Sequence, residues 1–375
     1  MKTRAAVLHS FPHERPYATS RPLSIEEVDL DEPGYGEVLV RIAAAGLCHS
    51  DLSVINGDRP RPVPMALGHE ASGVVEICGE GVEDLVPGDH VIMVFVPSCG
   101  HCGPCAEGRP ALCEPGARAN AAGELLGGGR RIRLKGAPVS HHIGVSAFGE
   151  YAVVSRRSLV KIDRDFPLEK AALFGCAVLT GVGAVVNTAA VRPGQSVAVV
   201  GLGGVGLSAV LGALAAGAAD VIAIDIDEGK LAFAQRLGAT AVYNSRVEGA
   251  AARIREETKG GADVVVETAG VIPALDLAYQ ITRRGGQTVT ASLANPAAKF
   301  SVQQVGLVAE ERILRGSYLG GGVPSRDIPR YIRLYERGRL PVDQLLTSTG
   351  TLDGINEGFD LLAEGRTVRH VIRFD

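Results

Sequence analysis

The pattern of hydrophobic and polar positions divides the chain into two parts. Residues 1–45 carry short runs typical of β-strands, which are Ala5–Leu8, Leu23–Val28 and Glu37–Ala43. From about residue 178 onward, strand-like runs alternate with helical segments. That alternation is typical of a parallel sheet covered by helices. The sequence therefore predicts an α/β protein in which a mostly-β domain precedes a doubly wound domain.

The segment Ser196–Asp225 contains the strongest local pattern. A β-branched run leads into four glycines, a helix of small residues follows, and a second apolar run ends at Asp225; the glycines are Gly201, Gly203, Gly204 and Gly206. This order of strand, glycine turn, helix, strand and acid is the dinucleotide-binding βαβ unit. Its helix N-terminus offers free N–H groups to a pyrophosphate, and the acid can accept hydrogen bonds from a ribose.

A membrane span is the alternative for part of this segment, because the 23 residues Val197–Ala219 carry no charge. The run contains six glycines, however, and further strand-like runs follow it. The dinucleotide-binding interpretation is therefore preferred. Three later strand-like runs, Ala241–Tyr243, Val264–Glu267 and Gln287–Ala291, bring the expected sheet to about six strands.

After Gly320 the pattern changes again. Two helical segments, Ile328–Arg337 and Ile355–Glu364, lead to a last strand-like run at Val368–Phe374. We expect this tail to rejoin the first domain.

Composition narrows the classes of function. The 375 residues are 46% hydrophobic and 21% charged, with a net charge of −4, which predicts neither a nucleic-acid partner nor an anionic membrane surface. The first 16 residues do not resemble a signal peptide, since His9 and Pro12 interrupt their short apolar run. Seven cysteines in such a chain indicate reduced thiols in the cytoplasm, used for metal binding or catalysis.

Four cysteines lie close together at spacings of 3, 3 and 8 residues, namely Cys99, Cys102, Cys105 and Cys113. Glycines between them let one loop wrap a single tetrahedral ion. Two disulfides are the alternative, which a reducing compartment disfavours. The pattern predicts a closed, structural zinc site.

Three further residues form a possible second metal site: Cys48, His69 and Cys176. Two thiolates and one imidazole are the Cys₂His set of a catalytic zinc site with an open fourth position. Each cysteine alone is more often a buried small hydrophobe, and their wide spacing cannot establish a site. The pair His141-His142 could border a pocket, although such a pair is more often hydrogen-bonded at the surface.

Taken together, the chain resembles the zinc-dependent medium-chain dehydrogenases, in the alcohol dehydrogenase branch and near its long-loop classes. The resemblance covers nearly the whole chain and rests on seven motifs: GLCHSD (46–51), GHE (68–70), the four-cysteine lobe (99–113), GC…TG (175–181), GLGGVG (201–206), INEGFDLL (355–362) and GRTVR (365–369). It implies a GroES-like catalytic domain at 1–177 with a zinc lobe at 97–115. A Rossmann domain at 178–319 and a return to the catalytic domain at 320–375 would follow.

The resemblance also implies residue roles. Cys48, His69 and Cys176 would bind catalytic zinc, with Glu70 as an alternative ligand and Asp51 orienting His69. NAD would contact His49, Thr180, Val205, Asp225, Lys230 and Arg369, besides the glycine turn. Ser50 would bind the substrate hydroxyl and pass on its proton, and Phe95, Ile143 and Leu319 would line the substrate pocket. The family pairs its coenzyme domains into a homodimer, and a tetramer is the alternative.

The implied reaction interconverts a primary alcohol, aliphatic or aromatic, and its aldehyde, with zinc as Lewis acid and NAD as hydride carrier. A formaldehyde–thiol adduct and a polyol or secondary alcohol are the alternative substrates. Only half of the charged adduct site matches, because Asp58 is present but Pro60 replaces a second acid and Arg118 is shifted by one place. Ser53 stands where some relatives end the proton relay with His or Tyr, which leaves the final proton acceptor open. A catalytically silent relative is the remaining alternative, which the intact ligand set disfavours.

Overall fold

The computed structural model describes residues 1–374 and divides the chain into two compact units. The first unit consists of Met1–Cys176, Val323–Pro329 and Asp343–Asp375, and the second of Ala177–Gly322 and Arg330–Val342. The boundary therefore lies directly after Cys176. The segment 330–342 groups with the second unit, although the sequence suggested that the whole tail returns to the first.

A closed barrel forms one part of the first unit. Its strands are β1 (Lys2–Leu8), β2 (Leu23–Leu30), β7 (Ile132–Leu134), β8 (Ala137–His141) and β4 (Met65–Ala66). Alternate residues of these strands, including Val7, Leu30 and Val139, point into one buried core. The period of two in a strand explains why the interposed residues can remain polar.

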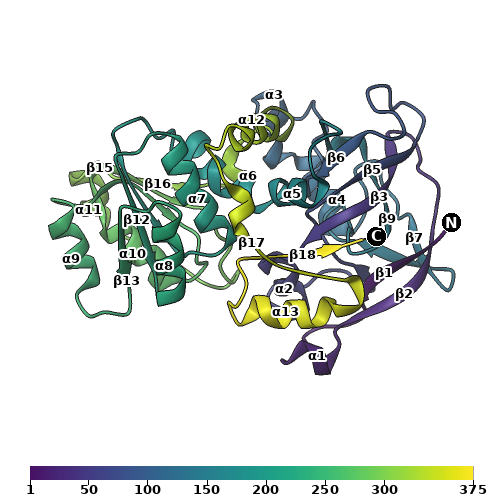
Figure 1. Ribbon diagram of the computed structural model, residues 1–375, viewed down its shortest axis with the longest axis horizontal. Coiled ribbons are helices and arrows are strands. Elements are labelled where there is room, and N and C mark those ends of the chain that lie inside the picture. The colour runs from purple at the N-terminus through teal and green to yellow at the C-terminus, as the bar shows by residue number, and fades with distance from the viewer. Residues whose placement is uncertain (375) are drawn as a thin grey trace. The chain divides into compact units, whose positions relative to one another are not determined.

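The second sheet of this unit joins the beginning of the chain to its end. Its order is β10 (Leu159–Ile162), β6 (His90–Met93), β5 (Ala71–Cys78), β3 (Glu37–Gly46), β18 (Arg369–Arg373) and β17 (Leu346–Gly350), with β9 (Tyr151–Ser155) also paired to β3. Strand β18 is antiparallel to β3, with Val371 opposite Gly46 (Figure 1). This pairing places Arg369 at the end of β3 where the GLCHSD motif begins.

Short helices complete the first unit: α1 (Tyr17–Ser20), α2 (His49–Ile55), α3 (Gly103–Ala106), α4 (Glu114–Ala122), α5 (Leu168–Ala171) and α13 (Ile355–Ala363). Helix α13 supports α1 through Asp360, whose carboxylate accepts hydrogen bonds from the main-chain N–H groups of Tyr17 and Ala18, both at 2.8 Å. Helix α12 (Pro324–Glu336) carries the chain from the first unit into the second.

The second unit contains a six-stranded parallel sheet. Its order is β13 (Ala241–Asn244), β12 (Asp220–Asp225), β11 (Ser196–Val200), β14 (Ala262–Glu267), β15 (Thr282–Thr290) and β16 (Ile313–Gly316). All five pairings are parallel, and the order reverses between β11 and β14. This is the doubly wound topology, so the predicted fold class, including the number of strands, is confirmed.

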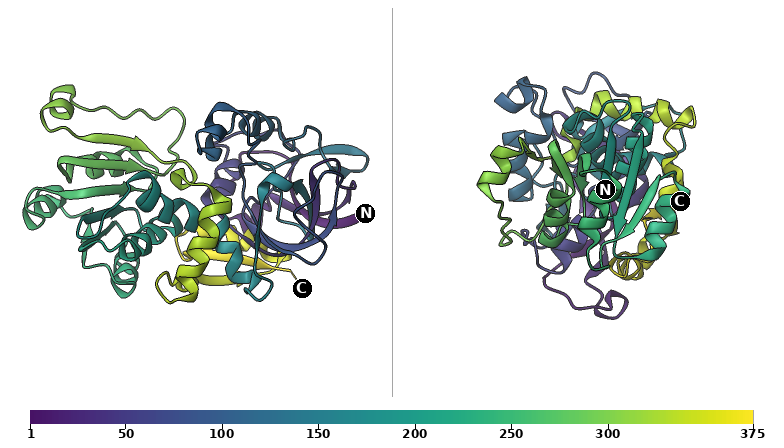
Figure 2. Two further views of the ribbon diagram at one scale, coloured as in Figure 1. Left: turned by 90° about the horizontal axis from the view of Figure 1, so that it is seen from above. Right: turned by 90° about the vertical axis from the view of Figure 1, so that its left-hand side faces the viewer.

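Helices cover both faces of this sheet (Figure 2). They are α6 (Ala177–Gly183), α7 (Gly204–Ala215), α8 (Glu228–Arg236), α9 (Ala250–Glu257), α10 (Ile272–Gln280) and α11 (Gln304–Ala309). Right-handed crossovers put α7 and α8 on one face and α9 and α10 on the other. Ile254 of α9 and Ala278 of α10 accordingly share one buried core cluster.

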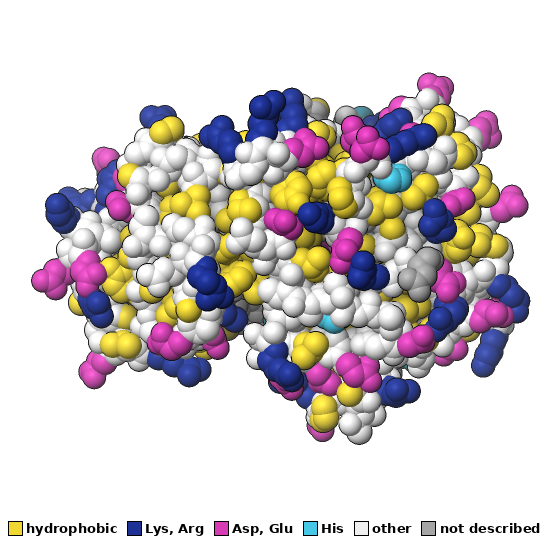
Figure 3. Space-filling view, in the orientation of Figure 1, with side chains coloured by type: hydrophobic (Ala, Val, Ile, Leu, Met, Phe, Trp, Pro, Cys, Tyr) yellow, Lys and Arg dark blue, Asp and Glu magenta, His cyan; other side chains and the backbone are white. Residues whose placement is uncertain are grey.

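The uncharged run at 197–219 is strand β11, the glycine turn and helix α7. Among the described residues, no single helix is long and apolar enough to cross a membrane; one bent pair, Leu168–Gly175 with Ala177–Thr188, passes by length and composition alone. Side chains of both charge signs are interspersed on the face shown in Figure 3, in keeping with the small net charge.

Candidate metal and coenzyme sites

Cys48 lies where strand β3 gives way to helix α2. It is the N-cap of α2, and its main-chain N–H donates to Asp51 Oδ2 at 3.1 Å. The first N–H groups of a helix and its positive dipole end favour a negative charge at this position. The position of Cys48 at the N-terminus of α2 therefore favours its thiolate form.

His69 reaches the same place from the end of strand β4. Gly68 before it has φ +98°, and a side chain there would collide with the backbone of Ala147 and Phe148. The His69 ring is fully buried, and its Nδ1 lies 2.9 Å from Asp51 Oδ1. A proton on Nδ1 leaves the lone pair on Nε2, which has no hydrogen-bond partner within residues 1–374.

Cys176 is positioned by a break between two helical stretches, Leu168–Gly175 and Ala177–Gly183. A 3₁₀ turn at Ala172–Gly175 ends at Cys176, which has φ −138° and ψ −78°, and α6 starts anew at Ala177. Gly175 packs so closely against the carbonyl of Met93 that no side chain fits there. This explains the Gly-Cys pair of the sequence motif.

The structure brings four candidate ligands together: Cys48 Sγ, His69 Nε2, Cys176 Sγ and a Glu70 oxygen, all within 4.8 Å of one another. All four residues are buried. A hydrogen bond between the two thiols lowers the pKa of Cys48 well below its ordinary value and raises that of Cys176. Burial lowers the pKa of His69, but Asp51 outweighs it and raises that pKa to about 10.

These groups share protons at a buried site. Metal binding replaces such protons, because a bound ion requires thiolates and a neutral imidazole. Two sulfurs and one nitrogen, the buried and unpartnered His69 Nε2, are donors that zinc prefers. The residues present therefore fit a zinc ion.

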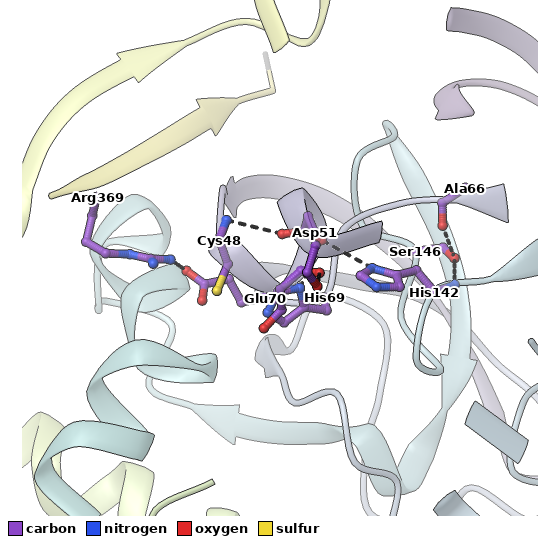
Figure 4. A network of polar contacts seen from close by, with 10 residues as sticks. Cys48, Asp51, Ala66, His69, Glu70, His142, Ser146 and Arg369 are labelled. Atoms are coloured by element: carbon purple, nitrogen blue, oxygen red, sulfur yellow. Dashed lines mark hydrogen bonds and ion pairs between the residues drawn. The ribbon is translucent and has the colours of Figure 1, made fainter. Parts of the chain in front are cut away.

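Glu70 and Arg369 form a buried ion pair beside these ligands (Figure 4). A side chain at position 46 would collide with both groups, which explains Gly46 at the start of the GLCHSD motif. The sequence assigned Arg369 to the coenzyme pyrophosphate and did not foresee its pairing with Glu70. A glutamate buried next to candidate metal ligands would have suggested the need for a cation.

The four-cysteine lobe forms the second candidate site. The sulfur atoms of Cys99, Cys102, Cys105 and Cys113 lie within 4.8 Å of one another. Main-chain N–H groups point at these sulfurs: Cys99 N donates to Cys113 Sγ at 3.2 Å and Cys102 N donates to Cys99 Sγ at 3.3 Å. The N–H of His101 lowers the pKa of Cys99 to about 6. Burial raises the pKa of Cys105 to about 12 and also raises that of Cys113, so a cation is needed to hold all four as thiolates, and the cluster fits a closed tetrahedral ion.

One predicted substrate residue of the first unit, Phe95, contacts a candidate metal ligand. The Phe95 ring meets His69 edge-on, with ring centroids 5.3 Å apart. Ile143 is 8% exposed, Ser50 is partly buried, and His49 is exposed at the start of α2. Thr180 and Leu319, together with Val205, belong to the second unit, where both Thr180 and Leu319 are buried.

The glycine turn of the second unit has the geometry that a dinucleotide needs. Gly201 has φ +91°, and a side chain there would strike Ala269, while one on Gly206 would strike the Gly201 carbonyl. The Cβ position of Gly203 faces open space, and no side chain caps α7, which begins at Gly204. A phosphate can therefore approach the free N–H groups of this helix, and the turn fits a dinucleotide.

Asp225 lies at the end of β12 with its carboxylate bound to the main chain. It accepts hydrogen bonds from the N–H groups of Leu202, Ile226 and Asp227 at 2.7, 2.8 and 3.0 Å. Lys230 lies one turn into α8, and its main-chain N–H binds Asp227. Asp225 thus joins strand β12 to the glycine turn.

One part of the sequence interpretation is wrong. His141 and His142 are not at the surface, since they are 0% and 2% exposed. His141 Nε2 accepts a hydrogen bond from Arg131 N at 3.0 Å, and His142 Nδ1 lies 3.2 Å from Asp51 Oδ1. Two histidines within the otherwise uncharged run Val139–Phe148 were a signal that could have placed them inside.

Comparison with known proteins agrees with this architecture. Residues 34–164 match the model of the alcohol dehydrogenase GroES-like domain, and residues 204–337 match that of the zinc-binding dehydrogenase. The NDMA-dependent alcohol dehydrogenase of Amycolatopsis methanolica is 41% identical over 99% of this chain and 99% of its own. Alcohol dehydrogenase B of Mycobacterium tuberculosis is 39% identical, covering 100% and 99%.

Among solved structures, benzyl alcohol dehydrogenase from Acinetobacter calcoaceticus matches with a TM-score of 0.93 and 32% identity, over the full length of both chains. The chain belongs to the family of zinc-dependent medium-chain alcohol dehydrogenases, and the resemblance recognised in its sequence is confirmed.

Proposed function

We propose that this alcohol dehydrogenase interconverts primary alcohols, aliphatic or aromatic, with their aldehydes, using NAD and two zinc ions per chain. The observation that carries the proposal is the buried set of Cys48, His69, Cys176 and Glu70 with the Phe95 ring against His69. The second zinc would be held by the four cysteines of the lobe. Seven reduced cysteines favour a cytoplasmic location.

When bound, zinc supplies Lewis-acid polarisation of the substrate oxygen and NAD supplies the hydride acceptor. The chain itself supplies orientation and a path for the proton. Asp51 fixes the His69 tautomer that presents Nε2. Ser50 Oγ takes the proton of the alcohol hydroxyl. Ser53 Oγ donates to the Ser50 carbonyl at 2.7 Å, so its own proton is engaged, and the proton leaves through Ser50 to water.

An apolar substrate suits the residues proposed to line the pocket beside the catalytic zinc site. Phe95 and Ile143 offer an aromatic ring and an aliphatic chain. The similarity to a protein named benzyl alcohol dehydrogenase points the same way. Asp58 and Arg118, the partial match to a charged-adduct site, are both exposed, and Asp58 is already bound to Asn56. Exposed, incompletely matched charges contribute little to the binding of such an adduct.

NAD is favoured by the glycine turn and by Asp225, which stands where a ribose is recognised. We further propose a homodimer formed through β16, with a tetramer as the alternative. Strand β16 is the edge of its sheet, and all four of its residues are exposed, including Ile313 at 45% and Leu314 at 39%. An open apolar edge is a template for pairing with a second copy.

The function is tested by measuring kcat/KM with NAD⁺ for hexanol, benzyl alcohol and S-hydroxymethylglutathione. We expect one of the two alcohols to be preferred. A preference for the thiol adduct of more than about tenfold, ~1.4 kcal/mol of transition-state binding, contradicts the alcohol assignment. Because one relative is named NDMA-dependent, each reaction is repeated with NDMA as acceptor. Turnover with NDMA but not with added NAD⁺ contradicts NAD as an exchangeable co-substrate.

A further inference from the structure

Asp51 lies at the centre of a buried network that reaches beyond the metal ligands (Figure 4). Its Oδ1 is 2.9 Å from His69 Nδ1 and 3.2 Å from His142 Nδ1, and its Oδ2 accepts the Cys48 N–H at 3.1 Å. Asp51 and His69 are fully buried, and His142 is 2% exposed. One carboxylate therefore contacts two candidate metal ligands and one further imidazole.

We propose that His142 is a positioning residue, whose Nδ1 anchors the Asp51 carboxylate so that Asp51 holds both His69 and the Cys48 main chain in the geometry for zinc. The inference rests on the proposed catalytic zinc. It assigns a role to a residue that does not itself bind the ion.

The fold brings His142 to Asp51 by a defined route. Strand β8 pairs in parallel with β4, with His141 opposite Ala66. The segments that follow the two strands leave this pair in the same direction, one toward His142 and the other toward His69. The two imidazole rings meet edge-on with their centroids 5.6 Å apart.

The turn after His142 is held in an unusual conformation. Ile143, Gly144 and Ser146 have φ values of +40°, +76° and +55°. For a residue other than glycine, a left-handed conformation is strained and persists only where its surroundings impose it. The surroundings here are Ser146 Oγ, which accepts from His142 N at 2.8 Å and donates to Ala66 O at 2.7 Å.

Burial explains why the anchor matters. A buried carboxylate keeps its orientation only where the groups packed against both of its oxygens hold it. Oδ2 is held by the Cys48 N–H and Oδ1 by the hydrogen bond with His69. His142 Nδ1 packs against Oδ1 at 3.2 Å without the alignment of a hydrogen bond. Loss of the His142 ring nitrogen would leave Oδ1 with His69 as its only imidazole contact and give the plane of the carboxylate room to turn. Such losses around a metal ligand typically weaken metal binding 10–100-fold.

A third metal ion is the competing explanation. The ligand atoms of Asp51, His69 and His142 also lie within 4.8 Å of one another. The His69–Asp51 distance of 2.9 Å is that of an ordinary hydrogen bond, which favours protons over an ion in this place. Metal analysis separates the two, since the proposal requires two zinc ions per wild-type chain and the alternative three.

The test measures zinc release from the loaded enzyme to an excess of chelator, with the four-cysteine site as an internal reference. His142→Phe keeps a ring but removes the nitrogen that faces Asp51 Oδ1, and we expect at least tenfold faster release of one zinc with unchanged release of the other. His142→Asn places an amide N–H where Nδ1 was and should stay within about twofold of wild type. His141→Gln changes the neighbouring buried histidine and should leave both rates unchanged.

A double-mutant cycle shows whether His142 acts through Asp51. Asp51→Asn with His142→Phe should release zinc no faster than Asp51→Asn alone, and additive effects would overturn the proposal. Wild-type release rates in His142→Phe, equal loss of both zincs, or an Asn variant as poor as the Phe variant would also overturn it. If His142→Phe does not fold, His142→Ala replaces it in the cycle. One zinc per wild-type chain would instead contradict the proposed function.

Discussion

The main-chain N–H of Leu202 donates a hydrogen bond to Asp225 Oδ2 at 2.7 Å, which links the end of β12 to the glycine turn. Asp225 therefore shapes the turn with part of its carboxylate and is only 8% exposed. Its charge lies where a ribose-bound phosphate would come closest in a dinucleotide-binding unit.

We expect the enzyme to prefer NAD over NADP because Asp225 repels a 2′-phosphate. Asp225→Ser should reduce the ratio of kcat/KM for NAD to that for NADP by roughly tenfold, ~1.4 kcal/mol, mainly by lowering the KM for NADP. It should also lower the thermal midpoint, since three N–H groups lose their acceptor. Initial rates with both coenzymes check the expectation. Asp227→Ser is the matched control, because serine preserves the cap of α8.

If the unmodified enzyme turned over NADP as efficiently as NAD, Asp225 would not be the ribose acceptor.

The two proposed zinc ions should have separable effects. Cys48→Ser should abolish turnover and remove one zinc while leaving the fold largely intact, because an open site does not hold the core together. Cys102→Ser should remove the other zinc and lower the thermal midpoint, because it breaks a closed cross-link of the lobe. Metal analysis and thermal unfolding of both variants measure this. A single ion in the wild-type chain, or equal destabilisation by both changes, would disprove it.

His141 should make the protein less stable in acid. Burial, together with Arg131 and Arg130, lowers its pKa to about 3 from an ordinary 6.5. Below pH 6.5 His141 is therefore protonated in the unfolded chain but stays neutral in the folded protein. The free energy of unfolding falls as the pH drops toward 3. At pH 5 the loss is about 2 kcal/mol.

His141→Gln keeps an acceptor for the Arg131 N–H but cannot titrate. Urea unfolding of both proteins at pH 7, 6 and 5 should show a smaller acid loss in the variant by about 2 kcal/mol. Contributions from the zinc ligands are common to both proteins and cancel in the comparison. Parallel pH profiles would show that His141 is not protonated on unfolding in this range.

The oligomeric state should depend on the edge of the second unit. Ile313→Lys places a charge on β16 and should shift the protein toward the monomer, because charged edges resist strand pairing. Ile77→Lys is the matched control, since Ile77 is 47% exposed on β5 of the first unit. Light scattering of wild type and both variants measures the mass. An unchanged mass for Ile313→Lys would place the interface elsewhere.

Local sequence determines the glycine turn, the four-cysteine lobe and the elements of the six-stranded sheet. The glycine turn and the four-cysteine lobe were recognisable because their residues are close neighbours, so the chain between them fixes their geometry. The six-stranded sheet followed from the alternation of strands and helices, because period-two and helical patterns record which faces are buried.

Only the tertiary structure decided what distant segments do together. Cys48, His69 and Cys176 are far apart in sequence, and strand pairing together with a helix break brings their ligand atoms within 4.8 Å. The contact of His142 with Asp51 depends on the parallel pairing of β4 with β8 and on the turn that Ser146 holds. Sequence gives a polar residue's chemistry but not its burial or its partner, because both depend on long-range packing. The sequence therefore left His142 between a pocket and the more common surface position, while the fold makes it a neighbour of Asp51 and His69.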